Sequence, residues 1–210
     1  MLTKLHRKDA FDRERLAPNS RRQFLHAFVF VALTAGYALH DVRHAQAQSS
    51  KPTEYEVKAA YLYNFGRFVE WPSRTGMAQL HSFNICVVGQ DHFGAALSNT
   101  LADETIAGKS VAIKRIQGAQ EATNCQILFI STSEESQLKQ ILTVLKGSSV
   151  LTVSDMPQFS RQGGMVQFVL DGSRVRFEIN LASAERAGLT LSSELLKLAV
   201  NVRNNSALGD

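Results

Sequence analysis

The chain has 210 residues, 23 of them Lys or Arg and 19 Asp or Glu, which gives a formal net charge of +4 at pH 7. Eight of the basic and four of the acidic residues lie in residues 1–47, so the remainder carries 15 of each and no net charge. A neutral remainder lacks the positive excess that phosphate-backbone binding draws on, which argues against nucleic acid as a partner. About 160 residues is enough for one domain with its own core.

The first 47 residues are predicted to be a cleaved export signal. An uncharged run at 27–39 follows Arg21 and Arg22, and its thirteen residues fall short of the roughly 20 that a helix needs to cross a bilayer core. Ala45-Gln46-Ala47 then offers an A-x-A site for signal peptidase. We expect cleavage after Ala47 and a periplasmic protein; an uncleaved anchor is the alternative.

The export route is indicated by Ser20-Arg21-Arg22-Gln23-Phe24-Leu25, which resembles the twin-arginine signal. That route carries folded proteins. An ordinary secretory signal, which also needs positive charge, is the alternative. Beyond the signal we expect a short linker at 48–53, one domain at 54–203 and a polar tail at 204–210.

The chain has two cysteines, Cys86 and Cys125, and both follow the export signal. An even number of cysteines in an exported protein indicates a disulfide. Two buried free thiols are the alternative.

Helical spacing runs through the segment that starts at residue 54. Mostly apolar side chains recur at i, i+3, i+4, i+7, i+8 and i+11, namely Val57, Ala60, Tyr61, Asn64, Phe65 and Phe68. We expect this helix to end before Pro72, because the residue before a proline avoids helical backbone angles.

The rest of the chain alternates predicted strands with predicted helices. Strands are expected at 83–88, 110–116, 125–131 and 149–155, and helices at 91–101, capped by Asp91, and at 133–146, stopped by Gly147. A hairpin at 163–180 around Asp171-Gly172, a short helix at 182–187 before Gly188, and a last helix at 191–202 follow. The order predicts a single α/β domain with a mixed, mostly parallel sheet flanked by helices and a C-terminal antiparallel hairpin.

Motifs for catalysis or metal binding are missing from this sequence. His81 and His92 are the two histidines beyond the signal, and neither sits in a metal-ligand pattern. There is no G-x-S-x-G elbow, and the glycines at 89 and 94 complete neither G-x-G-x-x-G nor a P-loop. We therefore expect no enzyme activity, no cofactor and no metal.

Six segments carry a resemblance to a known family. They are "EVKAAYLYNFGRFVEWP", "ICVVG", "CQILFIS", "VLTVSD", "GGMVQFVLDGSRVRFEIN" and "AGLTLSSELLKLA". In this order they resemble the YfiR family of periplasmic proteins over nearly all of 54–203. The resemblance implies an α/β fold that is often dimeric and has no known catalysis. Cys86 and Cys125 match a disulfide of the family, whereas a second disulfide of its best-understood member has no cysteines here.

The same resemblance implies partners. The best-understood member holds the periplasmic sensor domain of an inner-membrane diguanylate cyclase inactive, and an outer-membrane lipoprotein sequesters it to release the enzyme. We therefore expect a homodimeric repressor of a membrane diguanylate cyclase, which lowers cyclic di-GMP signalling.

Three polar residues near the end of the sheet are candidates for binding a small ligand. Arg176 and Asn180 share one face of a strand by its period of two, and Asp155 ends another strand. Half-buried strand alternation explains Arg176 and Asn180 without a function, and Asp155 could equally cap a turn or a helix.

Aromatic residues of the first helix, with one arginine, are candidates for partner binding. Tyr63, Arg67 and Trp71 combine the residue types that anchor protein interfaces. Packing of Trp71 into the core at the end of the helix is the alternative.

Two other functions are compatible with the sequence. One is a periplasmic sensor or small-ligand-binding module that serves a different membrane receptor; whether a cyclase with a periplasmic domain is encoded beside this gene would separate it from the repressor. The other is an enzyme with an unrecognised site, which an acid or base titrating near neutrality, and needed for turnover, would reveal.

Overall fold

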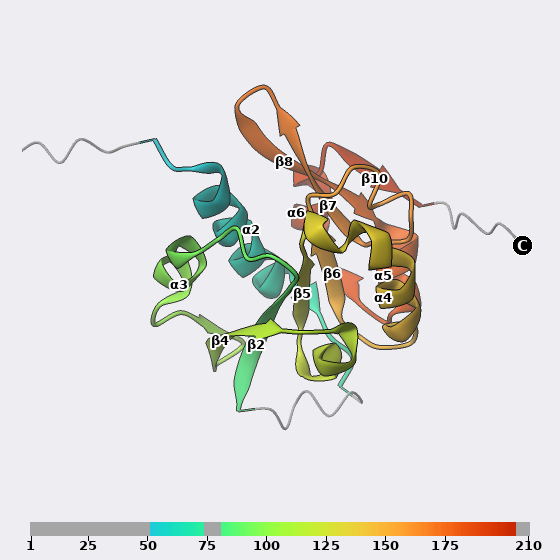
Figure 1. Cartoon of the computed structure of the whole chain (residues 1–210), viewed down its shortest axis with the longest axis horizontal. Coiled ribbons are helices and arrows are strands. Elements are labelled where there is room, and N and C mark those ends of the chain that lie inside the picture. The colour runs from blue at the N-terminus through green and yellow to red at the C-terminus, as the bar shows by residue number, and fades with distance from the viewer. Residues whose placement is uncertain (1–50, 74–80, 205–210) are drawn as a thin grey trace, which may run out of the picture. The chain divides into compact units, whose positions relative to one another are not determined.

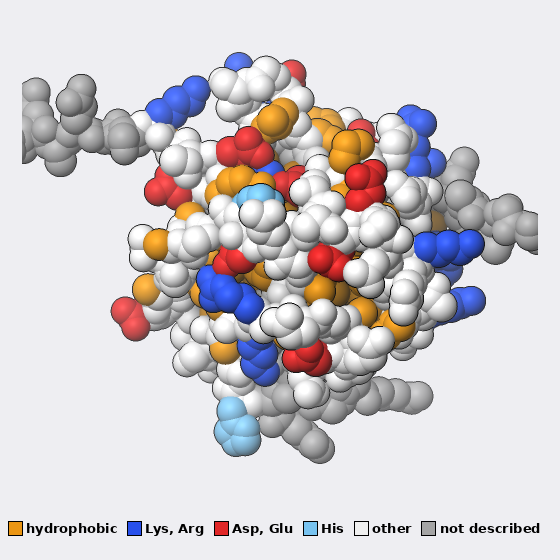
Figure 2. Space-filling view, viewed as in Figure 1, with side chains coloured by type: hydrophobic (Ala, Val, Ile, Leu, Met, Phe, Trp, Pro, Cys, Tyr) orange, Lys and Arg blue, Asp and Glu red, His pale blue; other side chains and the backbone are white. Residues whose placement is uncertain are grey.

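The computed structural model describes residues 51–73 and 81–204 (Figure 1). The predicted signal at 1–47, residues 48–50 of the linker and residues 205–210 of the tail lie outside the described residues. The boundaries predicted for these segments therefore stay predictions. Figure 2 shows acidic and basic side chains interspersed over one face of the molecule.

The helices are short except for the first. They are α2 (Glu54–Phe68), α3 (Ala95–Leu101), α4 (Leu138–Val144), α5 (Leu181–Arg186) and α6 (Ser193–Leu198), with two 3-10 helices, η2 (Ala119–Asn124) and η3 (Thr132–Gln137). The strands are β1 (Val69–Glu70), β2 (Ser82–Val88), β3 (Thr105–Ile106), β4 (Lys109–Ile116), β5 (Ile127–Ile130), β6 (Leu151–Ser154), β7 (Val166–Asp171), β8 (Arg174–Asn180), β9 (Thr190–Leu191) and β10 (Asn201–Arg203).

Eight strands form one sheet in the order β10-β8-β7-β6-β5-β2-β4-β3. Its pairs are parallel except for β7 with β8 and β3 with β4. Both edge strands are short, and β3 covers only Lys109 and Ser110 of β4. A second, two-stranded sheet joins β1 and β9. The predicted α/β class, with its mostly parallel sheet and C-terminal hairpin, is confirmed.

Strand alternation divides the buried side chains between the two faces of the sheet. Ile85 and Val87 of β2 join the cluster under α2 and α3, whereas Cys86 and Val88 join the cluster under η2 and α4. The same alternation holds in β5. Because parallel strands are covered on both sides, each strand is apolar throughout its length.

The helix α2 begins with a capping box at Thr53. The Thr53 hydroxyl accepts from the Glu56 backbone N–H, and the Glu56 carboxylate accepts from the Thr53 N–H at 2.7 Å. Its buried face is a different stripe from the one predicted and consists of Lys58, Ala59, Leu62, Phe65 and Gly66. Of the predicted stripe only Phe65 is fully buried. Small residues on the buried stripe let the helix approach the sheet, and larger rings pack along its flanks.

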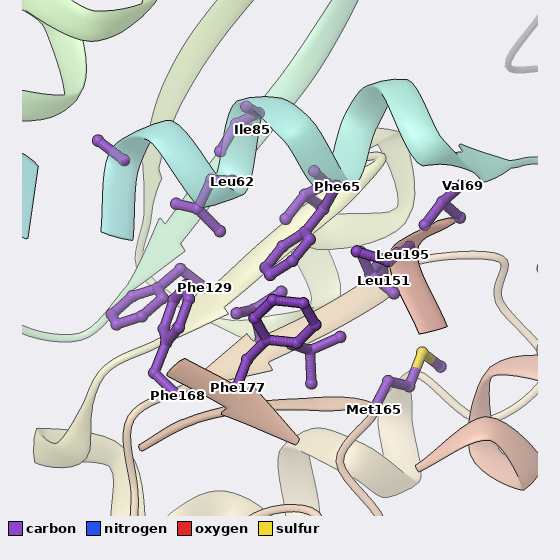
Figure 3. Close-up of a cluster of buried hydrophobic side chains, with 14 of the residues drawn as sticks. Leu62, Phe65, Val69, Ile85, Phe129, Leu151, Met165, Phe168, Phe177 and Leu195 are labelled. Carbon is purple, nitrogen blue, oxygen red and sulfur yellow. The ribbon is translucent and has the colours of Figure 1, made fainter. Parts of the chain in front are cut away.

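Aromatic packing fixes α2 on the hairpin strands. Figure 3 shows Leu62 and Phe65 pointing from the helix toward Phe168 and Phe177. The rings of Phe65 and Phe177 meet edge to face with centroids 5.2 Å apart, and Phe65 stacks on Phe168 at 5.9 Å. Such pairs add roughly 0.5–1.5 kcal/mol each beyond the burial of their area.

Three further local predictions were wrong. The helix α3 begins after Gly94 rather than Asp91, because the Asp91 carboxylate accepts from the Phe93 N–H and pairs with Arg115 at 2.7 Å. In the hairpin, Asp171 pairs with Arg174, so the turn is at 172–173, one residue further along. The last helix ends at Leu198, and the chain then adds β10 beside β8.

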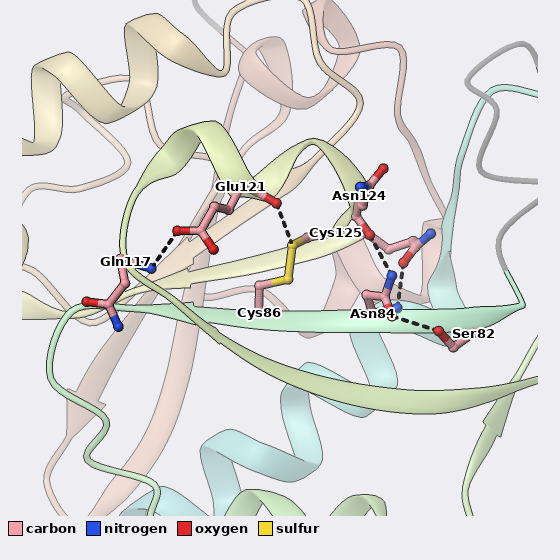
Figure 4. Close-up of a disulfide and its surroundings, with 8 residues drawn as sticks. Ser82, Asn84, Cys86, Gln117, Glu121, Asn124 and Cys125 are labelled. Atoms are coloured by element: carbon pink, nitrogen blue, oxygen red, sulfur yellow. Dashed lines mark hydrogen bonds between the residues drawn. A yellow bond between two sulfur atoms is a disulfide. The ribbon is translucent and has the colours of Figure 1, made fainter.

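Cys86 and Cys125 form the predicted disulfide, which joins the middle of β2 to the segment before β5 (Figure 4). Their Cα atoms are 6.0 Å apart and both residues are fully buried. Beside the bond, Asn84 donates from its side chain to the Asn124 backbone oxygen at 2.6 Å. The loop before β5 is thus tied to β2 by a covalent bond and by a hydrogen bond.

Removing the disulfide by replacing Cys86 and Cys125 with alanine should lower the free energy of unfolding by about 4 kcal/mol, from the loop-closure entropy of a bond that spans 39 residues. We expect the variant still to unfold cooperatively, since the twin-arginine route would require the domain to fold before its thiols are oxidised. Urea denaturation of the variant, beside the reduced wild type, measures both quantities. Loss of any cooperative transition would contradict this expectation.

Candidate functional site

The end of α2 brings together the three residues predicted to bind a partner. Tyr63 and Arg67 lie one helical turn apart, and the Arg67 guanidinium is 5.6 Å from the centre of the Tyr63 ring, within cation–π range. Trp71 follows β1, which is fixed by the pairing of Val69 with Leu191. Arg67 and Trp71 line the same groove.

Trp71 is half-buried at the edge of the core. Its ring meets that of Phe83 edge to face, with centroids 5.2 Å apart. Within the described part of the chain, its Nε1 is the one buried side-chain polar atom without a hydrogen-bond partner. A buried donor without an acceptor costs about 1–3 kcal/mol, so a hydrogen bond to this indole N–H would be favourable. Because the atom itself is buried, a bound molecule would reach it only if the Trp71 ring turned toward the groove.

The groove beside Trp71, called the α2 groove below, has a volume of about 670 Å³. Its lining combines apolar side chains with charges of both signs, among them Phe83, Ile106, Arg67, Glu70 and Lys109. This volume is within the usual range for binding pockets.

Gly66 sets how closely α2 approaches the wall of this groove. A Cβ at this position would lie 2.5 Å from the Ile106 Cδ1 atom and 3.1 Å from the Phe83 ring. The absence of a side chain therefore allows the helix to rest directly on these two residues.

Asp155 lies elsewhere, at the carboxyl end of β6, where it holds the N-terminal half of α2. The Lys58 ammonium, whose side chain is 3% exposed, donates to Asp155 at 2.5 Å and pairs with Glu54 at 2.6 Å. The Tyr55 hydroxyl also donates to Asp155, at 3.2 Å. Lys58 further lies 4.3 Å from the centre of the Tyr55 ring.

The pKa values of these groups follow from their surroundings. Burial alone would lower the pKa of Lys58, but hydrogen bonds to Asp155 and Glu54 outweigh it and the pKa is raised. Burial, followed by the charge of Asp155, raises the pKa of Tyr55. In the C-terminal half of α2, a hydrogen bond to Glu104 raises the pKa of Tyr63. Lys58 therefore stays charged at neutral pH.

The three residues predicted to bind a small ligand share no contact among the described residues. Asn180 is buried, accepts from the Ser183 N–H as the cap of α5, and donates to the Ser160 backbone oxygen at 2.8 Å. Arg176 is half-buried on β8, opposite Val169. Asn180 thus has a structural role, and a ligand role for these residues stays a prediction.

The chain is similar to one described protein family over most of its length. A family model described as YfiR/HmsC-like matches residues 55–200, well over half of the chain. The chain belongs to this family. Membership supports a periplasmic regulator of diguanylate cyclase signalling, and the family is regulatory rather than catalytic.

Two solved structures are similar to this YfiR/HmsC-like chain. A conserved domain protein from Vibrio cholerae O1 biovar El Tor shares 13% identity with a TM-score of 0.49, over 73% of this chain and 62% of its own. The ABC domain in complex with L-Trp from Streptococcus pneumonia shares 16% identity with a TM-score of 0.44, over 57% of this chain and 55% of its own. With TM-scores below 0.5, neither likeness indicates a ligand or an activity here.

Two features are absent from residues 51–73 and 81–204 of the YfiR/HmsC-like chain. None of the helices there has the length and apolar character that crossing a membrane requires. No set of three or more His, Cys, Asp or Glu in these residues is placed to hold a metal ion.

The Lys58 contacts were not predicted from the sequence. A signal was present, because Lys58, Leu62 and Phe65 follow the i, i+4, i+7 spacing of a buried helical stripe. A lysine on such a stripe needs a buried acid, and Asp155 provides it.

In this YfiR/HmsC-like domain, Asp155→Asn should lower the free energy of unfolding by about 2 kcal/mol. Removing one partner of a buried ion pair costs roughly 3–5 kcal/mol, and Glu54 still pairs with Lys58. The matched control is Glu54→Gln. Because the Glu54 side chain is 40% exposed, this substitution should lower the free energy of unfolding by less than about 1 kcal/mol. Urea denaturation measures both, and equal losses would contradict the central role of Asp155.

The pH dependence provides a second measurement on the same pair. Because the folded-state pKa of Lys58 is raised, its contribution is complete below the unfolded-state pKa of about 10.4 and is lost as the pH rises through the folded value. Tyr55, with its raised pKa, acts in the same direction. Stability should thus fall above about pH 10, and less steeply in Lys58→Met.

Proposed function

We propose that this protein is a periplasmic repressor that binds the periplasmic sensor domain of an inner-membrane diguanylate cyclase through the α2 groove, and so lowers cyclic di-GMP signalling. Family membership supports the regulatory role. The observation that carries the proposed surface is the buried, unpaired Trp71 N–H at a groove that Arg67 also lines.

The residue types of the α2 groove suit a protein partner. Tryptophan, tyrosine and arginine dominate the energetics of protein interfaces, especially where they surround a pocket that can be closed to water. If binding turns the Trp71 ring toward the groove, an acceptor on the partner, a backbone carbonyl or a carboxylate, would pair with its N–H. Arg67 beside Tyr63 would stabilise an acidic group in the same segment.

Repression through this surface requires no chemistry. A protein that binds the inactive conformer of a receptor more tightly than the active one shifts the population by the ratio of the two affinities, and a 100-fold preference corresponds to about 2.7 kcal/mol. In this proposal the protein acts as a homodimer, which would match a two-fold receptor. An outer-membrane lipoprotein that covers the same groove would release the cyclase.

Two substitutions test the groove. Trp71→Phe keeps an aromatic ring against Phe83 but removes the unpaired N–H, so the free domain should keep its stability while partner binding weakens by about 10-fold.

Tyr63→Ala should weaken association with a second copy or with the partner and spare the monomer fold, since the Tyr63 ring is only half-buried. Sedimentation measures self-association, and thermal unfolding measures the fold.

The cellular measurement is the cyclic di-GMP concentration in a strain without this gene. It should rise on deletion and fall again when the gene is restored. Trp71→Phe should restore it only in part, and a version without residues 1–47 not at all. Arg161→Ala, an exposed arginine outside the groove, is the matched control and should complement fully. Full complementation by Trp71→Phe would contradict the assignment of the partner surface to the α2 groove. An unchanged cyclic di-GMP concentration on deletion would contradict the repressor function itself.

A further inference from the structure

A second groove lies between α4, the loop that precedes β7, and α5. Its volume is about 550 Å³. It is called the basic groove below because its charged lining residues are Lys139, Lys146 and Arg186, and no Asp or Glu lines it. In Figure 2 basic side chains lie along the right-hand edge, on the side where Figure 1 labels α4 and α5.

The charge of this groove is uncompensated. Among the described residues, none of these three cations forms an ion pair. The α2 groove, by contrast, includes Glu70, and the groove around Lys58 includes two carboxylates that bind the lysine. The basic groove therefore has the electrostatic character that favours an anion.

The cations are placed to act together. Lys139 lies in the first turn of α4, and Lys146 lies in the turn that follows the helix. Their separation of seven residues, about two helical turns, places them on the same side. Arg186 is held by its own helix: its Nε donates to the Ala182 backbone oxygen at 3.1 Å and its Nη2 to the Ser183 hydroxyl at 2.9 Å. A guanidinium has five N–H donors, so others remain for a ligand.

Two buried hydroxyls add donors at the floor of the groove. The Thr152 Oγ1, on a residue 1% exposed, accepts from the Met165 N–H at 3.1 Å, and the Ser183 Oγ, on a residue 5% exposed, accepts from Arg186. In both cases the hydroxyl oxygen accepts a hydrogen bond, and the hydroxyl proton has no acceptor among the described residues. A ligand with several acceptor oxygens would satisfy both protons.

The remaining wall is apolar. Leu142, Leu145 and Met165 line the groove beside the cations. A bare inorganic ion would leave this wall uncovered, whereas an anion attached to a small apolar body would bury it.

We propose that the basic groove binds a phosphate monoester or phosphodiester group carried on a small apolar body. Three cations and two hydroxyl donors suit the several oxygens of a phosphate better than the two of a carboxylate. The group could come from a free organic phosphate or from the headgroup of an anionic lipid. The site is separate from the α2 groove and does not depend on the repressor function.

Calorimetric titration of the exported protein with phenyl phosphate tests the site, with inorganic phosphate and benzyl alcohol as the two half-probes. Phenyl phosphate should bind at least about 10-fold more tightly than either. Vesicles of phosphatidylglycerol, compared with phosphatidylcholine, test the lipid source. Binding of phenyl phosphate supports the free ester, and binding of phosphatidylglycerol vesicles alone supports the lipid headgroup. Equal affinity for inorganic phosphate and phenyl phosphate would overturn the proposal. So would a failure of both phenyl phosphate and phosphatidylglycerol vesicles to bind.

The variant Lys146→Gln with Arg186→Gln locates the site. Both side chains are exposed, and the hydrogen bonds of Arg186 lie within its own helix, so the thermal unfolding midpoint should fall only slightly, while the Kd for the phosphate probe that binds should rise at least about 10-fold. Lys114→Gln, an exposed lysine on β4 outside the groove, is the matched control and should leave the Kd unchanged. An unchanged Kd in the double variant would place binding elsewhere and overturn the assignment.

Discussion

The packing of α2 on the sheet is the contact on which the rest of the structure depends. Phe65 packs against the rings of both Phe168 and Phe177, and Gly66 rests on Ile106 and Phe83 without a side chain between them. The first contact fixes the helix on the hairpin strands, and the second fixes it near β3. Because these two neighbouring residues fix the C-terminal half of α2, Arg67 has a defined place in the lining of the α2 groove.

An ion pair holds the other end of the same helix. Lys58 is buried with Asp155, which lies at the carboxyl end of β6. In many α/β proteins this edge of the sheet holds the ligand site. Here the charges at that edge neutralise one another, so the edge serves the fold. Uncompensated charge and unpaired donors occur instead in two grooves elsewhere: the cations of the basic groove and the buried indole N–H beside the α2 groove have no counterpart among the described residues.

Much of the fold could be predicted from the sequence because its signals are local. Apolar strand runs, the Gly147 stop, and the serine cap of α6 each depend on a few neighbouring residues. The hairpin register shows the limit: Asp171-Gly172 predicted the turn, but pairing with Arg174 moved it by one residue. β10 was missed because a three-residue edge strand is defined by its partner β8 rather than by its own sequence. Residue type alone made Tyr63, Arg67 and Trp71 candidates for partner binding, and that role stays a prediction; residue type did not indicate that Arg67 and Trp71 line one groove. The pairing of Lys58 with Asp155 joins residues 97 apart in sequence, a distance that no local pattern reports.

The two edges of the main sheet limit how this protein can associate. An edge strand with free backbone groups invites another strand to pair with it. Here β10 and β3 are only three and two residues long, and the part of β4 that β3 leaves uncovered carries the exposed Lys114 and Arg115. Short and charged edges discourage one copy from extending the sheet of the next. These edges favour association through side-chain surfaces, whose shape and charge distinguish one partner from another, over backbone pairing, which would accept any extended chain.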